Sequence, residues 1–280
     1  MPPKVRAAVQ KISYGLFDLL FPDNCRLCDR ALTEVTRVPI CAECLAKPEP
    51  LAAEYYCTTC RAPFSSAFPL DANGRCALCR HGFHGFDEAY TFGFYDGVLR
   101  ELIQTFKYGG IPTLARPLGQ LLSRALPRDA GFDVIVPMPM HWRRRLQRGY
   151  NQADLLAKEL AVHTGLPVRR LVKRSKATAP QAGLTGAKRR ANVTAAFRVK
   201  QRDRVAGLRV LLVDDVLTTG ATAGACAREL KRAGAKGVTV LTVARADRRM
   251  WTETGSTKIV AGFSFQPTGS LADGKSGSFA

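Results

Sequence analysis

Residues 210–225 read VLLVDDVLTTGATAGA, and this stretch decides the fold expected for the chain. It opens with four aliphatic residues, 210–213, a run short and β-branched enough to predict a strand buried on both faces. Asp214 and Asp215 follow where that strand is expected to end, and a loop rich in threonine and glycine comes next. Apolar residues then recur at helical spacing until Gly234, which predicts a helix and its end. The stretch therefore predicts a strand, a loop and a helix in succession.

The loop after the two acids carries groups suited to a phosphorylated sugar. Its hydroxyls and backbone N–H groups, at the positive end of a helix dipole, suit a phosphate. The adjacent carboxylates can accept hydrogen bonds from vicinal hydroxyls or help hold a hydrated divalent cation. The structural alternative is that the acids only end the strand and the threonines only cap the helix. All of these residues in this order favour the ligand site.

The same stretch resembles the phosphoribosyl pyrophosphate loop of type I phosphoribosyltransferases, in which an apolar strand precedes two acids, two variable residues and TTGAT. The resemblance implies that Asp214 and Asp215 are the catalytic pair and contact the ribose 2′- and 3′-hydroxyls. It also implies that the loop cradles the 5′-phosphate. The loop residues assigned in this way are Val216, Leu217, Thr218, Thr219, Gly220, Ala221 and Thr222.

The chain has 280 residues and a formal net charge of +19, with an isoelectric point of about 10.0. That length allows one good core and a smaller module. The charge predicts anionic partners, either nucleic acid, phosphate-bearing substrates or both. A solvated surface is the alternative for any single basic cluster, but several clusters favour an anion-binding surface. The clusters lie at residues 143–148, 169–176, 188–190 and 245–249.

No stretch of the sequence resembles a membrane span. Residues 1–21 are basic, with apolar residues near helical spacing, which predicts a short amphipathic helix. Asp18 interrupts the apolar end and no small-residue cleavage site follows, so a signal peptide is not expected. We expect this helix to pack on its own domain, with contact to a membrane surface as the alternative.

Eight of the nine cysteines form four CxxC pairs. Two such pairs can place four thiolates around one tetrahedral Zn²⁺, so two structural zinc ions are predicted. Sequential pairing is the simplest arrangement, and the spacing leaves a cross-braced one open. Redox-active pairs are the alternative, but four pairs without a signal peptide favour metal in a reducing, cytosolic compartment. The predicted ligands are Cys25, Cys28, Cys41 and Cys44, then Cys57, Cys60, Cys76 and Cys79.

Three further metal-binding side chains are not expected to bind metal. His81 and His84 lie just behind the last CxxC pair, where four thiolates already complete the ligand set. Cys226 stands alone in the helix after the phosphate loop and is expected to be a buried packing residue.

The middle of the chain alternates strand and helix patterns, as is typical of α/β folds. Pro137 and Pro139 end the second expected strand and force a turn at its carboxyl end, where ligands bind in open α/β sheets. Residues 174–197 are polar, basic and weakly periodic, which is typical of an active-site lid. The expected strands lie at residues 89–95 and 133–136, and the expected helices at 98–106, 114–126 and 151–163.

Further motifs extend the resemblance over residues 19–245. They are the CxxC knuckles, FKYGG, VPMP, RRRLQRGYNQA, TAPQAGLTGAKRRANVTAAF and LLVDDVLTTGAT, and in this order they resemble the ComF family of bacterial proteins. That family joins a double zinc ribbon to a type I phosphoribosyltransferase domain and is tied to natural competence and DNA uptake. The resemblance implies a cytoplasmic protein that works beside a DNA-translocating helicase.

The family resemblance also assigns supporting residues. The turn of Pro137, Met138 and Pro139 corresponds to the loop on the pyrophosphate side. Arg144, Arg145 and Arg148 are candidates to neutralise diphosphate oxygens. The lid candidates are Gln181, Arg190 and Asn192.

We therefore expect an α/β protein with a type I phosphoribosyltransferase-like parallel sheet flanked by helices, preceded by a small double zinc-ribbon domain. The expected divisions are a helix and double zinc ribbon at residues 1–85, a phosphoribosyltransferase-like domain at 86–250 and a flexible tail at 251–280. Within the tail, residues 259–265 are expected either to add an edge strand or to be disordered.

Three functions remain open at this point. The first is an active phosphoribosyltransferase that uses phosphoribosyl pyrophosphate with Mg²⁺. The second is a sensor or scaffold that keeps the pocket without turnover. The third is a zinc-ribbon module that binds single-stranded DNA or a helicase. The sequence shows no strongly placed general base, so it assigns neither the acceptor nor turnover, and it leaves the oligomeric state open.

Overall fold

A computed structural model of the chain describes residues 24–32, 37–82, 85–127, 130–174 and 196–246. All of them belong to one compact unit, Met1–Asp247. The expected N-terminal helix, most of the expected lid and the tail with its expected strand lie outside the described residues. The division expected at residue 85 stays a prediction.

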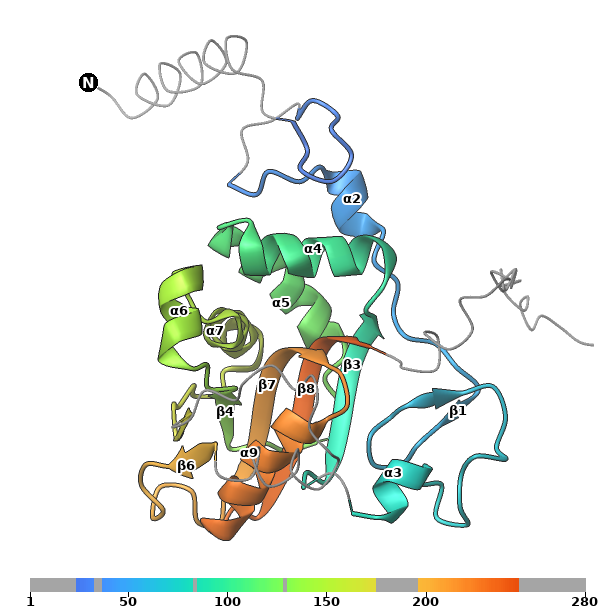
Figure 1. Cartoon of the computed structure of the whole chain (residues 1–280), viewed down its shortest axis with the longest axis vertical. Helices are drawn as coiled ribbons and strands as arrows, with labels where there is room; N and C mark the ends of the chain where they lie inside the picture. Colours follow the sequence, from blue (N-terminus) through green and yellow to red (C-terminus); the bar gives the residue numbers. More distant parts are fainter. Residues whose placement is uncertain (1–23, 33–36, 83–84, 128–129, 175–195, 247–280) are drawn as a thin grey trace, which may run out of the picture. The chain divides into compact units, whose positions relative to one another are not determined.

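Four parallel strands form the main sheet in the order β3-β8-β7-β4 (Figure 1). Parallel pairing requires a long crossover between successive strands, and helices supply these crossovers. The parallel sheet flanked by helices is therefore confirmed. The strands are β3 (Glu88–Phe94), β4 (Val134–Pro137), β7 (Arg209–Leu217) and β8 (Gly237–Arg245).

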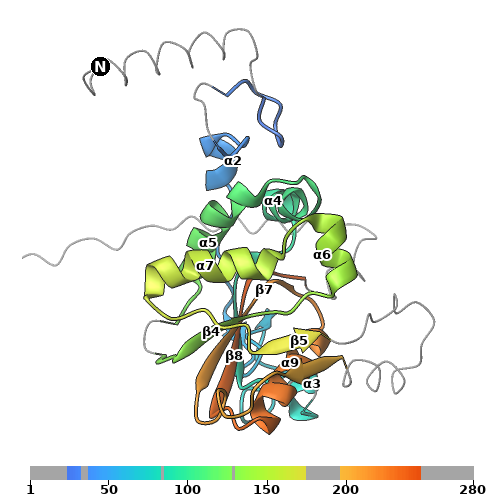
Figure 2. The same cartoon turned by 90° about the vertical axis from the view of Figure 1, so that its left-hand side faces the viewer.

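Helices cover both faces of this sheet (Figures 1 and 2). One face packs in a hydrophobic cluster with α4, α5 and α7, and includes Leu211. The other packs with α9 and includes Leu212. Neighbouring residues of β7 belong to opposite clusters because successive side chains of a strand point to opposite faces. The helices are α4 (Gly97–Tyr108), α5 (Ala115–Arg124), α7 (Gln152–Thr164) and α9 (Ala221–Arg232).

Two short hairpins and several small helices complete the described chain. The antiparallel pairs are β1 (Tyr55–Tyr56) with β2 (Pro63–Phe64), and β5 (Val172–Arg174) with β6 (Phe197–Val199). The small helices are α2 (Ala42–Ala46), α3 (Ala77–Arg80), η1 (Pro112–Leu114) and α6 (Trp142–Arg148). Within the described ranges, none of the helices has both the length and the apolar character needed to cross a membrane.

Strand β7 is longer than its aliphatic run predicts. The sequence places the end of the strand at residue 213, but the strand continues to Leu217. The expectation is wrong because β8 extends equally far and pairs Asp214 with Thr242 and Val216 with Ala244. The two acids therefore lie on regular strand backbone rather than on a loop, and each has a defined face of the sheet.

Helix α6 is not expected from the sequence. None of its side chains is buried, so it lacks the apolar periodicity that predicts a helix. It begins after His141, whose Nδ1 accepts a hydrogen bond from the backbone N–H of Arg143 at 3.3 Å. It ends at Gly149, whose φ of 78° belongs to the left-handed region that favours glycine.

Candidate functional site

The acid pair lies near the carboxyl end of β7, with its two side chains on opposite faces of the sheet. Strand alternation places Asp215 on the face of Leu211, beneath α4, and Asp214 on the face of Leu212, beside α9. The backbone N–H of Asp215 donates to Asp214 Oδ1 at 3.0 Å. The two carboxylates therefore have different surroundings.

Asp215 is ion-paired with a lysine that the sequence analysis did not identify as a site residue. Lys107 Nζ lies 2.9 Å from Asp215 Oδ1, and only 15% and 12% of the two side chains is exposed. The same ammonium lies 5.9 Å from the centre of the Tyr95 ring. A pair with this little exposure is screened much less by water and salt than a surface pair. The available sequence signal was FKYGG, which places Lys107 directly after the buried Phe106.

Asp214 has a pKa raised to about 7, because burial disfavours its charged form and Asp215 repels it. Lys107 and Arg174 oppose that shift. The Arg174 guanidinium is itself desolvated, which lowers its pKa, and it lies 5.4 Å from the centre of the Phe197 ring. Asp214 is therefore poised near neutral pH, and a ligand that donates hydrogen bonds to it favours its ionised form.

The loop after β7 leads into the N-terminus of α9. Gly220 has a φ of 72°, a conformation that strains residues with a side chain. Thr219 Oγ1 accepts a hydrogen bond from the backbone N–H of Ala221 at 3.4 Å. Because α9 has 12 residues, the N–H groups of its first turn and its dipole favour an anion at this loop. Leu217 is 3% exposed and packs in the core, so it offers the loop only its backbone.

The turn after β4 is hydrogen-bonded both to β7 and to the residue that precedes α7. The backbone N–H of Met138 donates to the carbonyl of Val213 at 2.8 Å, next to the acid pair. Asn151 occupies the expected N-cap position of α7, but its Nδ2 donates instead to the carbonyl of Met138 at 3.1 Å. Because Pro137 is in register with Val213, the predicted turn and the acid pair lie at the same edge of the sheet.

The three arginines implied for the diphosphate lie on α6, just after this turn. Arg144 and Arg145 are exposed, and Arg144 is close enough to Arg174 to help lower its pKa. Arg148 is already engaged, since its Nη2 donates to Tyr108 Oη at 3.0 Å. Arg144 therefore lies close to Arg174, which itself lies close to Asp214. Arg148 instead contacts Tyr108 at the end of α4.

The lid candidates Gln181, Arg190 and Asn192 lie outside the described residues. The two described ends of that segment are paired, with Arg174 opposite Phe197 in the β5–β6 hairpin. The described residues that flank the segment therefore lie side by side, and Arg174 is close enough to Asp214 to lower its pKa.

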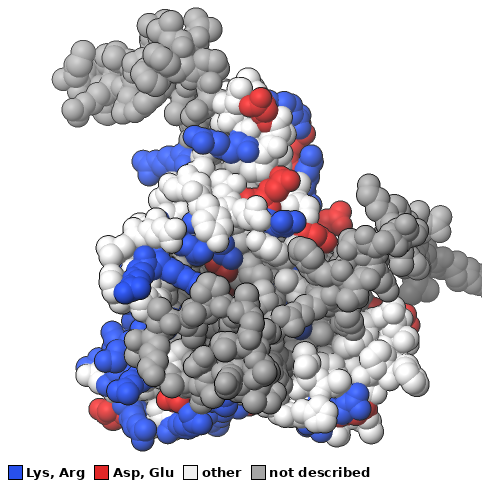
Figure 3. All heavy atoms as spheres, in the orientation of Figure 1, with Lys and Arg blue, Asp and Glu red and all other residues white. Residues whose placement is uncertain are grey.

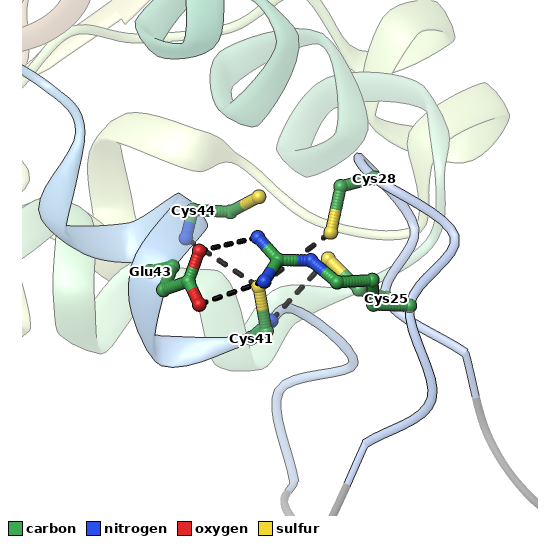
Figure 4. A network of polar contacts seen from close by, with 6 residues as sticks. Cys25, Cys28, Cys41, Glu43 and Cys44 are labelled. Atoms are coloured by element: carbon green, nitrogen blue, oxygen red, sulfur yellow. Dashed lines mark hydrogen bonds and ion pairs between the residues drawn. The ribbon is translucent and has the colours of Figure 1, made fainter.

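The first cysteine cluster combines the first two CxxC pairs. The four ligand atoms, which all lie within 4.8 Å of one another, belong to Cys25, Cys28, Cys41 and Cys44. The backbone N–H of Cys41 donates to Cys25 Sγ at 3.3 Å, as Figure 4 shows. The guanidinium of Arg30 is paired with Glu43 and donates to the Cys28 sulfur. The backbone N–H of Arg30 and, second, its guanidinium lower the pKa of the Cys28 thiol to about 6.

The second cluster combines the other two CxxC pairs and is fully buried. Its members are Cys57, Cys60, Cys76 and Cys79. The backbone N–H of Cys76 donates to Cys57 Sγ at 3.3 Å. Arg245, the last residue of β8, donates to the carbonyl of Cys60 at 2.6 Å and contacts its Sγ at 3.6 Å. A main-sheet strand thus reaches the cluster directly.

Both clusters have the geometry of a closed metal site. A tetrahedral ion about 2.3 Å from each sulfur places the sulfurs about 3.8 Å apart. The sulfurs of Cys28 and Cys41 are 3.7 Å apart, and those of Cys60 and Cys76 are 3.8 Å apart. The grouping is the sequential one, and His81 is not a member of either described cluster. Both clusters can therefore hold a zinc ion, while Cys226 is buried away from them as expected.

Several known proteins are similar in sequence to this chain. A family model described as phosphoribosyl transferase domain matches residues 146–267. Competence protein F of Haemophilus influenzae is 36% identical over 180 residues, which cover 61% of this chain and 78% of that protein. DNA utilization protein YhgH of Salmonella typhimurium is 31% identical over 234 residues, covering 81% and 99%. Competence protein ComFC of Bacillus subtilis is 32% identical over 146 residues, covering 50% and 56%.

Proposed function

The chain belongs to the ComF family, and from this membership we propose that it binds phosphoribosyl pyrophosphate with Mg²⁺ and takes part in DNA uptake or utilization in the cytoplasm. Its relatives Competence protein F and DNA utilization protein YhgH support the second half of the proposal. The observation that carries the first half is the acid pair on β7, placed directly before a Gly220 turn at the N-terminus of α9.

Each part of the ligand has a candidate partner at this site. Asp214 and Asp215 would accept hydrogen bonds from the ribose hydroxyls. The residues from Thr218 to Thr222 would bind the 5′-phosphate through N–H and hydroxyl groups. Arg144 and Arg145 are exposed and can turn toward the diphosphate.

If the chain turns this ligand over, the bond between C1 of the ribose and the diphosphate breaks while an acceptor attacks from the opposite face. The acids then orient the sugar, and the arginines stabilise the charge that develops on the departing diphosphate. The carboxylates are ligands of the hard type that Mg²⁺ prefers, and bound Mg²⁺ would neutralise part of the diphosphate charge.

We also propose one structural zinc ion in each cysteine cluster. The sulfur spacing and the burial of the ligands support this assignment. Elemental analysis should give two zinc ions per chain, and a folded preparation that contains no zinc would refute the assignment.

Calorimetry tests the ligand proposal. Phosphoribosyl pyrophosphate is titrated, with and without Mg²⁺, into the native protein and into the Asp214→Asn, Asp215→Asn variant. We expect saturable, Mg²⁺-dependent binding that the variant loses, and weaker binding below about pH 7, where Asp214 takes up a proton. Asp203→Asn, a change of an exposed acid, is the control. Absence of binding to the zinc-loaded native protein would overturn both the enzyme and the sensor forms of the proposal.

A basic cavity supports single-stranded DNA as a second ligand. The cavity, about 830 Å³, is lined by Arg169, Arg170, Leu171, Lys200, Gln201 and Arg204, at the β5–β6 hairpin. In Figure 3 the blue side chains gather at the lower left, over the region that Figure 1 labels β6. Cations grouped around a groove suit a phosphate backbone.

Salt dependence tests this second ligand. Binding of a fluorescent single-stranded oligonucleotide should fall linearly with salt on logarithmic axes, and the slope should be less steep in the Arg169→Ala, Arg204→Ala variant. Arg100→Ala with Arg116→Ala removes two equally charged, exposed side chains outside the cavity and is the control. An unchanged slope in the cavity variant would exclude the cavity as the DNA site.

A further inference from the structure

The last turn of α4 contacts three elements around the candidate ligand site, namely β7, α6 and the start of α7. Three consecutive residues of the FKYGG motif make these contacts, and each reaches a different element. Lys107 is paired with Asp215 on β7. The carbonyl of Phe106 accepts hydrogen bonds from Tyr150 Oη and from Gln152 Nε2, the latter at 3.5 Å.

The third residue of this turn meets α6. Tyr108 accepts a hydrogen bond from Arg148 Nη2 at 3.0 Å, and the guanidinium lies 4.8 Å from the centre of its ring. Arg148 also donates to Gln152 Oε1 at 3.3 Å. The turn thereby joins the acid pair to the segment that carries the arginines.

Charge explains why a cation belongs at this position. Two adjacent carboxylates alone would repel a ligand that carries a phosphate and a diphosphate. Lys107 offsets one of those negative charges inside a site where water screens little. An ammonium has three N–H donors, so its contact with Asp215 leaves donors for a ligand.

We propose that Lys107 binds the diphosphate of a phosphoribosyl ligand directly, while Phe106 and Tyr108 hold it between the acid pair and α6. This proposal rests on the proposed function. In the ligand, the diphosphate is attached to C1, and the hydroxyl on C2 is one of the two assigned to the acid pair. Lys107 is paired with one member of that acid pair, so it lies close to the edge of the ribose that adjoins C1 and its diphosphate.

A purely structural lysine predicts a different result. If Lys107 only orients Asp215, its removal disturbs the ribose hydroxyls and weakens every ligand that contains the sugar. If it contacts the diphosphate, its removal weakens only ligands that carry that group. Ribose 5-phosphate has the same hydroxyls and 5′-phosphate but lacks the diphosphate, so it separates the two cases.

The experiment compares both ligands on Lys107→Met, Lys107→Arg and Lys158→Met. Lys158 is exposed on α7, so its substitution is a control with the same change of charge. Calorimetry measures the affinity for phosphoribosyl pyrophosphate. The affinity for ribose 5-phosphate is measured by its competition with phosphoribosyl pyrophosphate, so that weak binding is still quantified. Thermal unfolding and zinc content verify that each variant is folded.

We expect Lys107→Met to weaken phosphoribosyl pyrophosphate about 10-fold or more, equivalent to ~1.4 kcal/mol, and to change ribose 5-phosphate by less than about 2-fold. Lys107→Arg should recover most of the loss. Equal weakening of both ligands, or no weakening of either, would overturn the proposal. If the native protein binds neither ligand, the proposed function fails, and this inference fails with it.

Discussion

The two cysteine clusters have the same four ligands and matching sulfur spacing, but their surroundings differ. In the first cluster, Cys28 and Cys41 are half-buried, and the neighbouring ion pair of Arg30 and Glu43 is exposed. In the second, all four cysteines are buried, and the adjacent arginine, Arg245, is 8% exposed. The same four-cysteine arrangement is therefore placed once at the surface and once in the core.

The clusters also join different faces of the sheet. Cys25 and Cys44 pack in the hydrophobic cluster of α4, α5 and α7, whereas the second set packs in the cluster of α9. Arg245 is in register with Leu217, the residue just before the phosphate loop. This difference in burial and packing indicates that the first cluster stabilises a surface segment. The second cluster stabilises the strand ends that position the ligand site.

The largest contrast is expected when each cluster loses one thiolate. In Cys60→Ser, loss of the metal leaves three buried thiols and removes the sulfur that Arg245 contacts, so we expect the sheet to unfold. Structural zinc binding is worth ~10 kcal/mol or more in small zinc domains. Cys28→Ser should lose one zinc ion and keep the sheet. Circular dichroism on heating and zinc analysis measure both. Equal destabilisation by the two variants would contradict the comparison.

Replacing the arginines gives a smaller contrast. Arg245→Met leaves the Cys60 carbonyl without its buried donor, at a cost of ~1–3 kcal/mol in the free energy of unfolding. Arg30→Met removes an exposed ion pair and should leave the free energy of unfolding unchanged within error. Urea denaturation measures both variants. A larger loss in Arg30→Met than in Arg245→Met would reverse the assigned roles.

A chelator should remove zinc from the two clusters at different rates. A chelator reaches the half-buried sulfurs of Cys28 and Cys41 without unfolding the chain, so the first zinc ion should leave before the second. Alkylation at successive times, followed by peptide mass analysis, identifies which cysteines have been exposed. Simultaneous labelling of both sets would show that the two sites open together.

The smallest expected effect is a shift in the pH at which acid releases the first zinc ion. The backbone N–H of Arg30 and, second, its guanidinium lower the pKa of the Cys28 thiol to about 6, so protons compete weakly with metal there. Only the guanidinium's contribution is lost on substitution. Arg30→Met raises this pKa, and the first cluster should then release zinc at a higher pH. A chromogenic chelator monitors release across pH. No shift would show that the backbone hydrogen bonds alone set the thiol's acidity.

Much of the site follows from local sequence patterns. CxxC spacing predicts the eight cysteine ligands and favours their sequential grouping while leaving a cross-braced one open. The acids, glycine and threonines after an aliphatic run predict the ligand loop. These signals are readable because each depends on neighbours within a few residues. The difference in burial between the two clusters is not readable, since it depends on which face of the sheet each segment reaches.

The missed features depend on contacts between distant segments. Strand β7 continues through Asp214 because β8 offers it backbone partners. Lys107 reaches the site only because α4 packs on the sheet. It comes 108 positions before Asp215 in the chain, so no local pattern links the two residues. Helix α6 has no buried residue, so it leaves no apolar period to detect. The expected lid residues and the ligand roles stay predictions.

The position of β3 has a consequence for synthesis on the ribosome. This strand pairs with β8, and Asp87 just before it accepts a hydrogen bond from the backbone N–H of Val238, 151 positions later. At typical translation rates, β3 emerges ~8–30 s before its partner exists. During that interval its backbone donors and acceptors are unpaired, so the nascent chain presents an open strand edge to chaperones and to neighbouring chains.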